Sequence, residues 1–369
     1  MALIAEFCFV SLDVVVILVP IQNNGKSSKN RRRKRWQESS NTVTVFNFSD
    51  KRIYDKRRPK GSLQEAAQII LDHIFLSPAI PTNYNLTTST QPPDPPFCPH
   101  EISAVIEHLP SGPGIYGIDN LLIKIIHKRF NNIFPTLFNR CLHLSCFPYS
   151  LKIVNIILFQ KGGKDQRLAS SYRPISLLPK IGKVLEKLMT QRLTYHLEST
   201  NSLNDRQHGF REGKSVDTAI HELLSKIQTA RRDGKHVLVL SIDIKGAFDN
   251  LQHRAILKSL DASACPVNIN RLFHSLLQNR KVTLLTPHGR TTKDQKQGCP
   301  QGSCSGPALW NLVANEIFNQ VWPDNVHIQA FADDFVLVIE ADTNKSLVIQ
   351  NKNNTKTMIQ NKSQTRKVQ

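Results

Sequence analysis

The stretch FADDFVLVIE, residues 331–340, places two adjacent carboxylates, Asp333 and Asp334, between apolar runs on both sides. The flanking runs VHIQAF (326–331) and FVLVIE (335–340) are short and rich in β-branched and aromatic residues, which is typical of two strands joined by a hairpin. Two carboxylates in an apolar setting are costly unless a cation or hydrogen bonds compensate for the lost water. A solvated surface hairpin with both side chains at its tip is the simpler interpretation, and a charged site with a compensating partner is the alternative.

A second strand upstream also ends in a carboxylate. The segment HVLVLSIDI, residues 236–244, is nearly all apolar and reaches Asp243 just before KGAFDNLQH. We predict that Asp243 is buried, and that two strands of one sheet bring it close to Asp333. Paired Mg²⁺ ions roughly 3.5 to 4 Å apart stabilise the attacking and leaving oxygens in phosphoryl transfer, and carboxylate oxygens are their natural ligands. The sequence therefore predicts a metal as the compensating cation.

A glycine-rich turn precedes an apolar helical pattern in GCPQGSCSGPALWNLVANEIF, residues 298–318. Such a turn presents free N–H groups and the positive end of a helix dipole, which suit a phosphate or a sugar. An ordinary turn is the alternative, because glycine together with proline usually marks no more than that. The helical pattern begins at Pro307, and the turn contains Gly298, Gln301, Gly302, Ser303 and Gly306.

Composition indicates a basic globular protein. The chain has 369 residues, of which 48 are Lys or Arg and 29 are Asp or Glu, so that its formal net charge is +19. This length suffices for about two domains' worth of core, and the charge favours a polyanionic partner such as nucleic acid over an ordinary solvated basic surface. The seven cysteines form no C-x-x-C pair, so neither a zinc site nor a disulfide framework is indicated and a reducing compartment fits best.

The N-terminal segment, residues 1–45, is apolar over residues 1–20 and then basic in KNRRRKRW (29–36). A membrane anchor would place Glu6 and Asp13 in lipid, at a cost of about 2.5 to 3.5 kcal/mol each near a helix centre. We therefore favour a strand-rich segment of unassigned role. The basic run is typical of a nuclear address, a nucleic-acid patch or a plain linker.

The rest of the chain divides by composition. Residues 46–97 are interpreted as a linker region, because IPTNYNLTTSTQPPDPPF (80–97) is rich in proline and threonine. Residues 98–342 are predicted to form a mixed α/β domain, and the polar, basic residues 343–369 are expected to be disordered. Within the domain, 151–159 is predicted as a buried strand. A helix is predicted from a stripe of apolar residues at helical spacing: Ile181, Val184, Leu185, Leu188, Met189 and Leu193.

Taken together and in this order, the motifs resemble those of reverse transcriptases of non-LTR retrotransposons, of the jockey-like kind, over about 98–340. The resemblance implies an α/β (α+β) fold, the fingers and palm of a right-handed polymerase with a mixed or antiparallel palm sheet. Three motifs carry it: SIDIKGAFDN (241–250) for D-x-x-x-A-F-D, GCPQGSCSGP (298–307) for G-x-P-Q-G-S-x-x-x-P, and FADD (331–334) for the catalytic hairpin. Two further segments support it: SSYRPISLLPKIGKVLEKLMTQRL (170–193) and QHGFREGKSVDTAI (207–220).

The resemblance also implies roles for single residues in the catalytic centre. Asp243 and Asp333 would hold two Mg²⁺ ions, or Mn²⁺ in their place, with Asp334 completing the carboxylate set and the Ile244 carbonyl assisting. Phe248 would exclude a 2′-hydroxyl, unless it is simply a core residue.

Further residues are implied to bind the incoming nucleotide. Gln301 would brace the nucleotide, and Arg173 would contact its triphosphate unless it only pairs with a nearby acid. Gly302 is also assigned to nucleotide binding, and Lys161 and Lys164 are weaker candidates. The implied partners are an RNA template, a DNA primer and dNTPs, in the nucleus or the cytoplasm, with no membrane expected and no protein partner inferable.

The sequence departs from the family pattern at several places. The family's P-K-P-G-K-D is QKGGKD (160–165), and its P-G-x-D-G-I is PGIYGI (113–118), with Tyr116 in place of the acid. After Ile339 the family's helix, L-N-x-x-K-T segment and thumb are not recognisable, so we expect a truncated polymerase without a thumb. The alternative function is a catalytically inactive, element-derived protein that binds nucleic acid.

Overall fold

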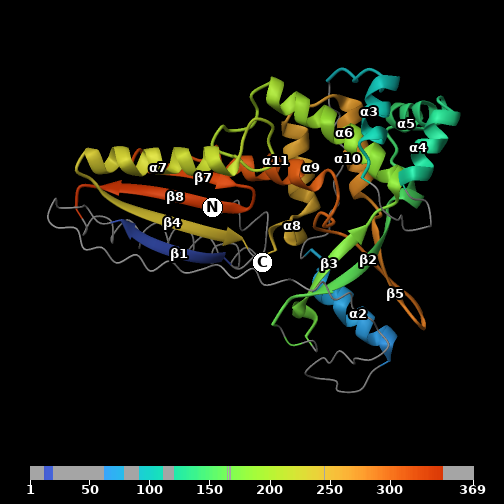
Figure 1. The fold of residues 1–369 in the computed structure, drawn as a ribbon, viewed down its shortest axis with the longest axis horizontal. Coiled ribbons are helices and arrows are strands. Elements are labelled where there is room, and N and C mark those ends of the chain that lie inside the picture. The colour runs from blue at the N-terminus through green and yellow to red at the C-terminus, as the bar shows by residue number, and fades with distance from the viewer. Residues whose placement is uncertain are drawn as a thin grey trace.

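Two four-stranded sheets organise the chain (Figure 1). The computed structural model describes residues 12–19, 62–78, 91–110, 120–163, 165, 168–244 and 246–343. The basic run 29–36 and the predicted polar tail beyond Thr343 therefore lie outside the described residues, as do Tyr116 and Lys164. The mixture of helices with one antiparallel and one mixed sheet confirms the predicted fold class.

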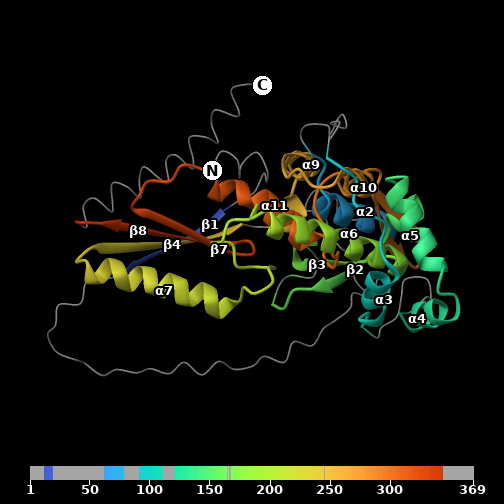
Figure 2. The ribbon, with the colours of Figure 1, turned by 90° about the horizontal axis from the view of Figure 1, so that it is seen from above.

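The first sheet carries the acidic motifs and has the strand order β1-β4-β8-β7, with all neighbours antiparallel. Its strands are β1 (Leu12–Val19), β4 (His236–Ile244), β8 (Asp334–Ala341) and β7 (Val326–Phe331). Helix α7 (Val216–Arg232) covers one face of this sheet (Figure 2). Its Ala230 packs against Val237, Val239 and Val338 in a small separate core.

The second sheet has the order β3-β2-β5-β6, with β2 and β5 parallel and the other neighbours antiparallel. Its strands are β2 (Ile153–Gln160), β3 (Tyr172–Leu177), β5 (Lys281–Thr286) and β6 (Gly289–Asp294). The predicted strand at 151–159 is thus present as β2.

Helix α2 (Leu63–Ile74) packs on the second sheet, inside the region that composition assigns to a linker. Its Ile70 and Leu71 are fully buried against a core that includes Val154 and Val282. A capping box at Ser62 begins the helix, because the Ser62 hydroxyl accepts from the Glu65 N–H while Glu65 accepts from the Ser62 N–H. The linker interpretation was wrong here, because it rested on the proline-rich part and overlooked this local start signal.

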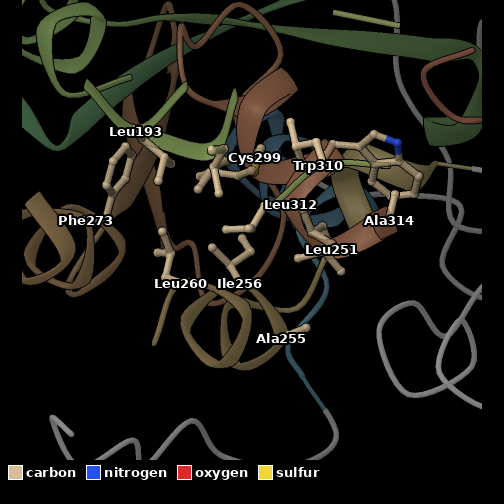
Figure 3. Packing of buried hydrophobic residues seen from close by; sticks show 14 of the residues in the cluster. Leu193, Leu251, Ala255, Ile256, Leu260, Phe273, Cys299, Trp310, Leu312 and Ala314 are labelled. Carbon is tan, nitrogen blue, oxygen red and sulfur yellow. The ribbon is translucent and has the colours of Figure 1, made fainter. Parts of the chain in front are cut away.

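The remaining helices form the main hydrophobic core, where Figure 3 shows side chains from several of them interdigitating around Ile256, Leu260 and Leu312. The predicted stripe lies on helix α6, which spans Lys180–Ser199, and its residues Val184, Leu185, Leu188, Met189 and Leu193 are buried while Ile181 is partly buried. The long helices are α3 (Pro99–Glu107), α4 (Asn120–Arg129), α5 (Ile133–His143), α6 (Lys180–Ser199), α9 (His253–Ala262), α10 (Val267–Leu277) and α11 (Gly306–Phe318). Short helical turns are α8 (Ala247–Asn250), η1 (Tyr149–Leu151) and η2 (Ala169–Ser171).

Within the described ranges, no helix combines the length and the apolar character needed to cross a membrane.

Candidate active site

Strand register brings the acidic motifs together. The antiparallel pairing of β4 with β8 sets Asp243 directly opposite Asp334. Asp333 lies beside them in the two-residue turn between β7 and β8, after Ala332, whose φ is 58°. Carboxylates from two distant parts of the sequence therefore meet at one end of the first sheet, which confirms the predicted hairpin and its proximity to Asp243.

Asp243 is exposed, so the prediction that it is buried was wrong. The reason is strand alternation: Ile242 and Ile244 are each 1% exposed and face the core, which turns the intervening side chain to the other face of β4. The apolar run around Asp243 indicated burial of the strand but not the direction of this side chain.

Burial and neighbouring charges raise the pKa values of two of the carboxylates, Asp333 and Asp334. Burial raises the pKa of the half-buried Asp333 above its usual range, and the charge of Asp243 adds to this effect. The pKa of Asp334 is raised first by burial and then by the charges of Asp333 and Asp243. Because like charges at short range disfavour ionisation, the cluster favours a bound cation.

The donor chemistry suits a hard divalent cation, because all three side chains offer carboxylate oxygens. Among the described residues, however, no three His, Cys, Asp or Glu side chains are gathered closely enough to hold a metal ion. The backbone register thus brings suitable ligands into one region, while the side chains do not form a finished coordination shell. The Ile244 carbonyl belongs to the residue that ends β4, next to Asp243.

Phe248 lies directly beyond β4, on α8, and is half-buried between two other aromatic rings. Its ring centroid is 5.6 Å from that of Trp310 and 6.0 Å from that of Phe210, which it meets edge to face. Trp310 is in the core, whereas Phe210 is 54% exposed. Phe248 therefore occupies the boundary between the core and the surface, which suits either of its predicted roles.

The glycine-rich loop before α11 is joined closely to α8. The Cys299 N–H donates to the Phe248 carbonyl at 2.8 Å. At Gly298, where φ is 78°, a Cβ atom would lie 2.5 Å from the Asp249 carbonyl oxygen. The loop therefore needs glycine for close backbone contact with the strand–helix junction that carries Asp243.

Free N–H groups at the start of α11 were predicted, and this prediction was wrong for the groups that open the helix. The Ser305 N–H donates to Glu186 at 3.1 Å, and the Gly306 N–H donates to the Ser303 hydroxyl at 3.0 Å. Glu186 is a fully buried carboxylate of α6. The positive end of this helix is thus neutralised from within the protein and is not open to a phosphate.

Other predicted nucleotide-binding residues line the junction of the second sheet with the same loop. The Ser176 N–H of β3 donates to the Gln301 carbonyl at 3.0 Å, and a Cβ at Gly302 would approach the Ser176 carbonyl at 3.4 Å. Arg173 is exposed on the same strand. Lys161 follows β2, and its Nζ donates to the Ser170 carbonyl at 2.9 Å.

Two residues of this region were not singled out from the sequence. Asp249 is half-buried, and burial raises its pKa to about 6. A hydrogen bond from Gln301 and the charge of Lys161 act in the opposite direction and lower this pKa. Gln207 is 1% exposed and contacts the turn that contains Asp333. Asp249 is the last acid of the D-x-x-x-A-F-D motif, and Gln207 is the first residue of the Q-x-G-F-R motif. Their positions in these motifs were the only indication in the sequence that they belong to the site.

Comparison of the sequence with known proteins gives a match to one family. A model of the reverse transcriptase (RNA-dependent DNA polymerase) family matches residues 160–365. The 115 kDa protein of the type-1 retrotransposable element R1DM of Drosophila melanogaster is 32% identical over 250 residues, or 67% of this chain and 24% of its own length.

Two further relatives give similar matches. The retrovirus-related Pol polyprotein from the type-1 retrotransposable element R1 of Bradysia coprophila is 36% identical, over 64% of this chain and 23% of the relative. The RNA-directed DNA polymerase from the mobile element jockey of Drosophila melanogaster is 27% identical, over 65% of this chain and 27% of the relative. The chain thus spans about a quarter of the length of the curated relatives it matches.

Proposed function

The chain belongs to the reverse transcriptase family, and we propose on this basis that its site adds deoxynucleotides to the 3′-hydroxyl of a primer paired with an RNA template. The observation that carries the proposal is the register that sets Asp243 opposite Asp334, with Asp333 in the adjoining turn. The similarity of the chain to the products of R1 and jockey elements confirms its resemblance to non-LTR retrotransposon proteins.

In this proposal two divalent cations, Mg²⁺ or Mn²⁺, are held by Asp243, Asp333 and Asp334 with the Ile244 carbonyl. Bound there, they would supply charge neutralisation at the reacting phosphate. The protein's own contribution is placement, because β4 and the β7–β8 hairpin fix the carboxylates relative to one another. Burial, together with repulsion from the neighbouring carboxylates, raises the pKa values of Asp333 and Asp334 and gives the site its preference for cations.

The incoming nucleotide is proposed to lie between this acidic end of the first sheet and the exposed face of β3. Arg173 would contact its phosphates, since a guanidinium matches phosphate oxygens with two parallel hydrogen bonds. Gln301 and Gly302 would line the nucleotide from the glycine-rich loop, with Lys161 as a further cation. Phe248 would contact the sugar and exclude a 2′-hydroxyl by its bulk.

An RNA template and a DNA primer are the proposed macromolecular partners, and the formal charge of +19 favours such polyanions. The nucleus or the cytoplasm is the proposed location. The same charge also favours the second candidate function, in which the chain binds nucleic acid without extending a primer.

One experiment separates the two candidate functions. The purified chain is given a primed RNA template, dNTPs and Mg²⁺, and primer extension and template binding are measured on the same sample. Extension that depends on dNTPs and on the divalent cation supports the polymerase. Tight binding without extension, under conditions in which a control reverse transcriptase is active, supports the binding protein and contradicts the proposed activity.

A further inference from the structure

We infer that Gln207 is a positioning residue that holds the β7–β8 turn, and with it Asp333, in the conformation that the reaction needs. The inference rests on the proposed polymerase function and concerns a residue outside the acidic cluster. It follows from the contacts that the segment around Gln207 makes with Ala332, the first of the two turn residues.

The segment around Gln207 pairs with the end of β7 at one point. The Ala330 N–H donates to the Arg206 carbonyl at 2.9 Å, and the His208 N–H donates to the Ala330 carbonyl at 2.8 Å. This forms an isolated parallel bridge between Gln207 and Ala330. The backbone of Gln207 is therefore fixed next to the end of β7, directly before the turn.

The Gln207 side chain binds both polar groups of the turn residue. Its Oε1 accepts from the Ala332 N–H at 3.1 Å, and its Nε2 donates to the Ala332 carbonyl at 3.2 Å. The Oε1 atom also accepts from the Gly209 N–H at 3.1 Å, which orients the amide group. The Trp310 Nε1–H donates to the same Ala332 carbonyl at 2.9 Å. All these groups are buried, so the loss of one of these hydrogen bonds would leave a buried polar atom with neither a protein partner nor water to bind.

Ala332 needs such support because its φ of 58° lies in the left-handed region, which residues with a Cβ atom rarely adopt. A residue held there persists only when its surroundings determine its conformation. The next residue is Asp333, which the other two carboxylates repel. Because the Ala332 carbonyl belongs to the peptide group that joins Ala332 to Asp333, holding it also fixes the position of the Asp333 backbone.

Gly209 supports the turn from the same side. A Cβ atom at this position would lie 2.1 Å from the Ala332 nitrogen and 2.6 Å from its Cα atom. Asn311 of α11 holds the glycine by donating from Nδ2 to its carbonyl at 2.8 Å. The segment and the turn are therefore in direct backbone contact, with no room for a side chain between them.

The test compares Gln207→Met, which keeps the side-chain length and removes all three of its side-chain hydrogen bonds, with the control Gln329→Met. Gln329 is also buried on the hairpin, and its Nε2 donates to the Ala219 carbonyl of α7 at 2.6 Å, away from the turn. Three quantities are measured: amide hydrogen exchange over 330–336, Mn²⁺ affinity by water-proton relaxation, and kcat and KM for dNTP in primer extension.

We expect Gln207→Met to speed exchange at the turn at least tenfold, to weaken Mn²⁺ binding at least threefold and to lower kcat at least tenfold, with KM changed less than threefold. Gln329→Met should change the metal affinity and kcat less than twofold at a similar loss in Tm. Gly209→Ala should act in the same direction as Gln207→Met. If Gln207→Met does not fold, Gln207→Glu, which retains the acceptor for the Ala332 N–H, is measured instead.

The inference is overturned if the Gln207 variant matches the Gln329 control in exchange and in Mn²⁺ affinity. It is also overturned if the wild-type chain binds no Mn²⁺, since there is then no carboxylate site to position. Absence of extension by the wild-type chain contradicts the proposed polymerase function, while the exchange and Mn²⁺ measurements still decide the role of Gln207.

Discussion

Phe248 is the residue whose role depends most on its immediate surroundings. It is half-buried, with Trp310 on the core side and the exposed Phe210 on the other. We predict that Phe248→Val makes room for a 2′-hydroxyl and improves the use of ribonucleotides relative to deoxynucleotides about tenfold. This change corresponds to removing the steric penalty on the 2′-hydroxyl, which is about 1 to 3 kcal/mol. Single-nucleotide incorporation with dNTP and rNTP measures this ratio.

Phe318→Val is the matched control, because it truncates a buried aromatic ring that lies 6.1 Å from Phe335 and does not contact the rings around Phe248. If Phe248 is only a core residue, its truncation lowers Tm and depresses the use of both sugars equally. An unchanged sugar ratio in Phe248→Val would therefore remove this residue from the proposed nucleotide site.

Asp249 gives a prediction for pH. Burial raises its pKa from 3.8 to about 6 in the folded chain, so folding favours the protonated form. Its stabilising contribution is complete below about pH 4 and is lost as the pH rises through 6, a difference of up to about 3 kcal/mol in the free energy of unfolding. Asp249→Asn should lack this contribution to the pH dependence.

Urea unfolding of the wild type and of Asp249→Asn between pH 4 and 7.5 measures that difference. The free energy of unfolding of the wild type should fall relative to the variant as the pH rises across this window. Parallel curves for the two proteins would show that Asp249 has an ordinary pKa in the folded chain.

Single residues also show what the sequence could predict of the site. Asp243, Asp333 and Asp334 were predictable because each lies at the end of a strongly apolar strand within a specific motif. Gln207 and Asp249 were not, because their importance comes from contacts with loops distant in sequence, at Ala332 and Gln301. The direction of the Asp243 side chain depended on strand alternation, which an all-apolar run does not reveal.

Among the elements, β4 and α6 matched their sequence patterns closely, since each has a long periodic or continuous apolar signal. The strand that pairs with β4 on the side away from β8 was not predictable. Strand β1 pairs with β4 through the full register from Leu12 opposite Ile244 to Val19 opposite Val237. Nothing local in either segment specifies a pairing across so much of the chain, and the register of such strands is set by the sheet.

The β1–β4 pairing leads to a prediction about assembly. Deleting residues 1–19 should leave the outer edge of β4 unpaired, and an exposed strand edge promotes association between chains. We expect larger species in size-exclusion chromatography and a lower Tm for this deletion. Val15→Lys is the control, because Val15 is 57% exposed and its replacement preserves the strand. A monomeric deletion variant with unchanged Tm would contradict the role of β1 as the edge strand of this sheet.

For the whole molecule, the dominant property is its positive charge of +19. We predict that binding to RNA–DNA hybrids weakens steeply with salt, because each neutralised phosphate releases counterions and contributes about 0.9 to the slope of log affinity against log salt. Replacing residues 26–35 with a Gly-Ser segment of equal length should reduce that slope. A matched Gly-Ser replacement of 81–90, which has no charged residue, should leave it unchanged.

An affinity that is indifferent to salt between low and physiological concentrations would show that the basic composition forms an ordinary solvated surface. An undiminished slope after replacement of 26–35 would instead place the phosphate contacts on the described domain, where Arg173 and Lys161 are candidates.

The central proposal is that three carboxylates, aligned by the pairing of β4 with β8, give this chain polymerase activity. The most direct measurement is RNA-templated primer extension by Asp243→Asn beside Asp294→Asn, an exposed acid on β6 paired only loosely with Lys281 at 3.8 Å. We predict that Asp243→Asn binds the primed template as the wild type does, keeps or raises its Tm in metal-free buffer, and extends no primer, while Asp294→Asn remains active. Extension by Asp243→Asn at a rate near that of the wild type would contradict this proposal.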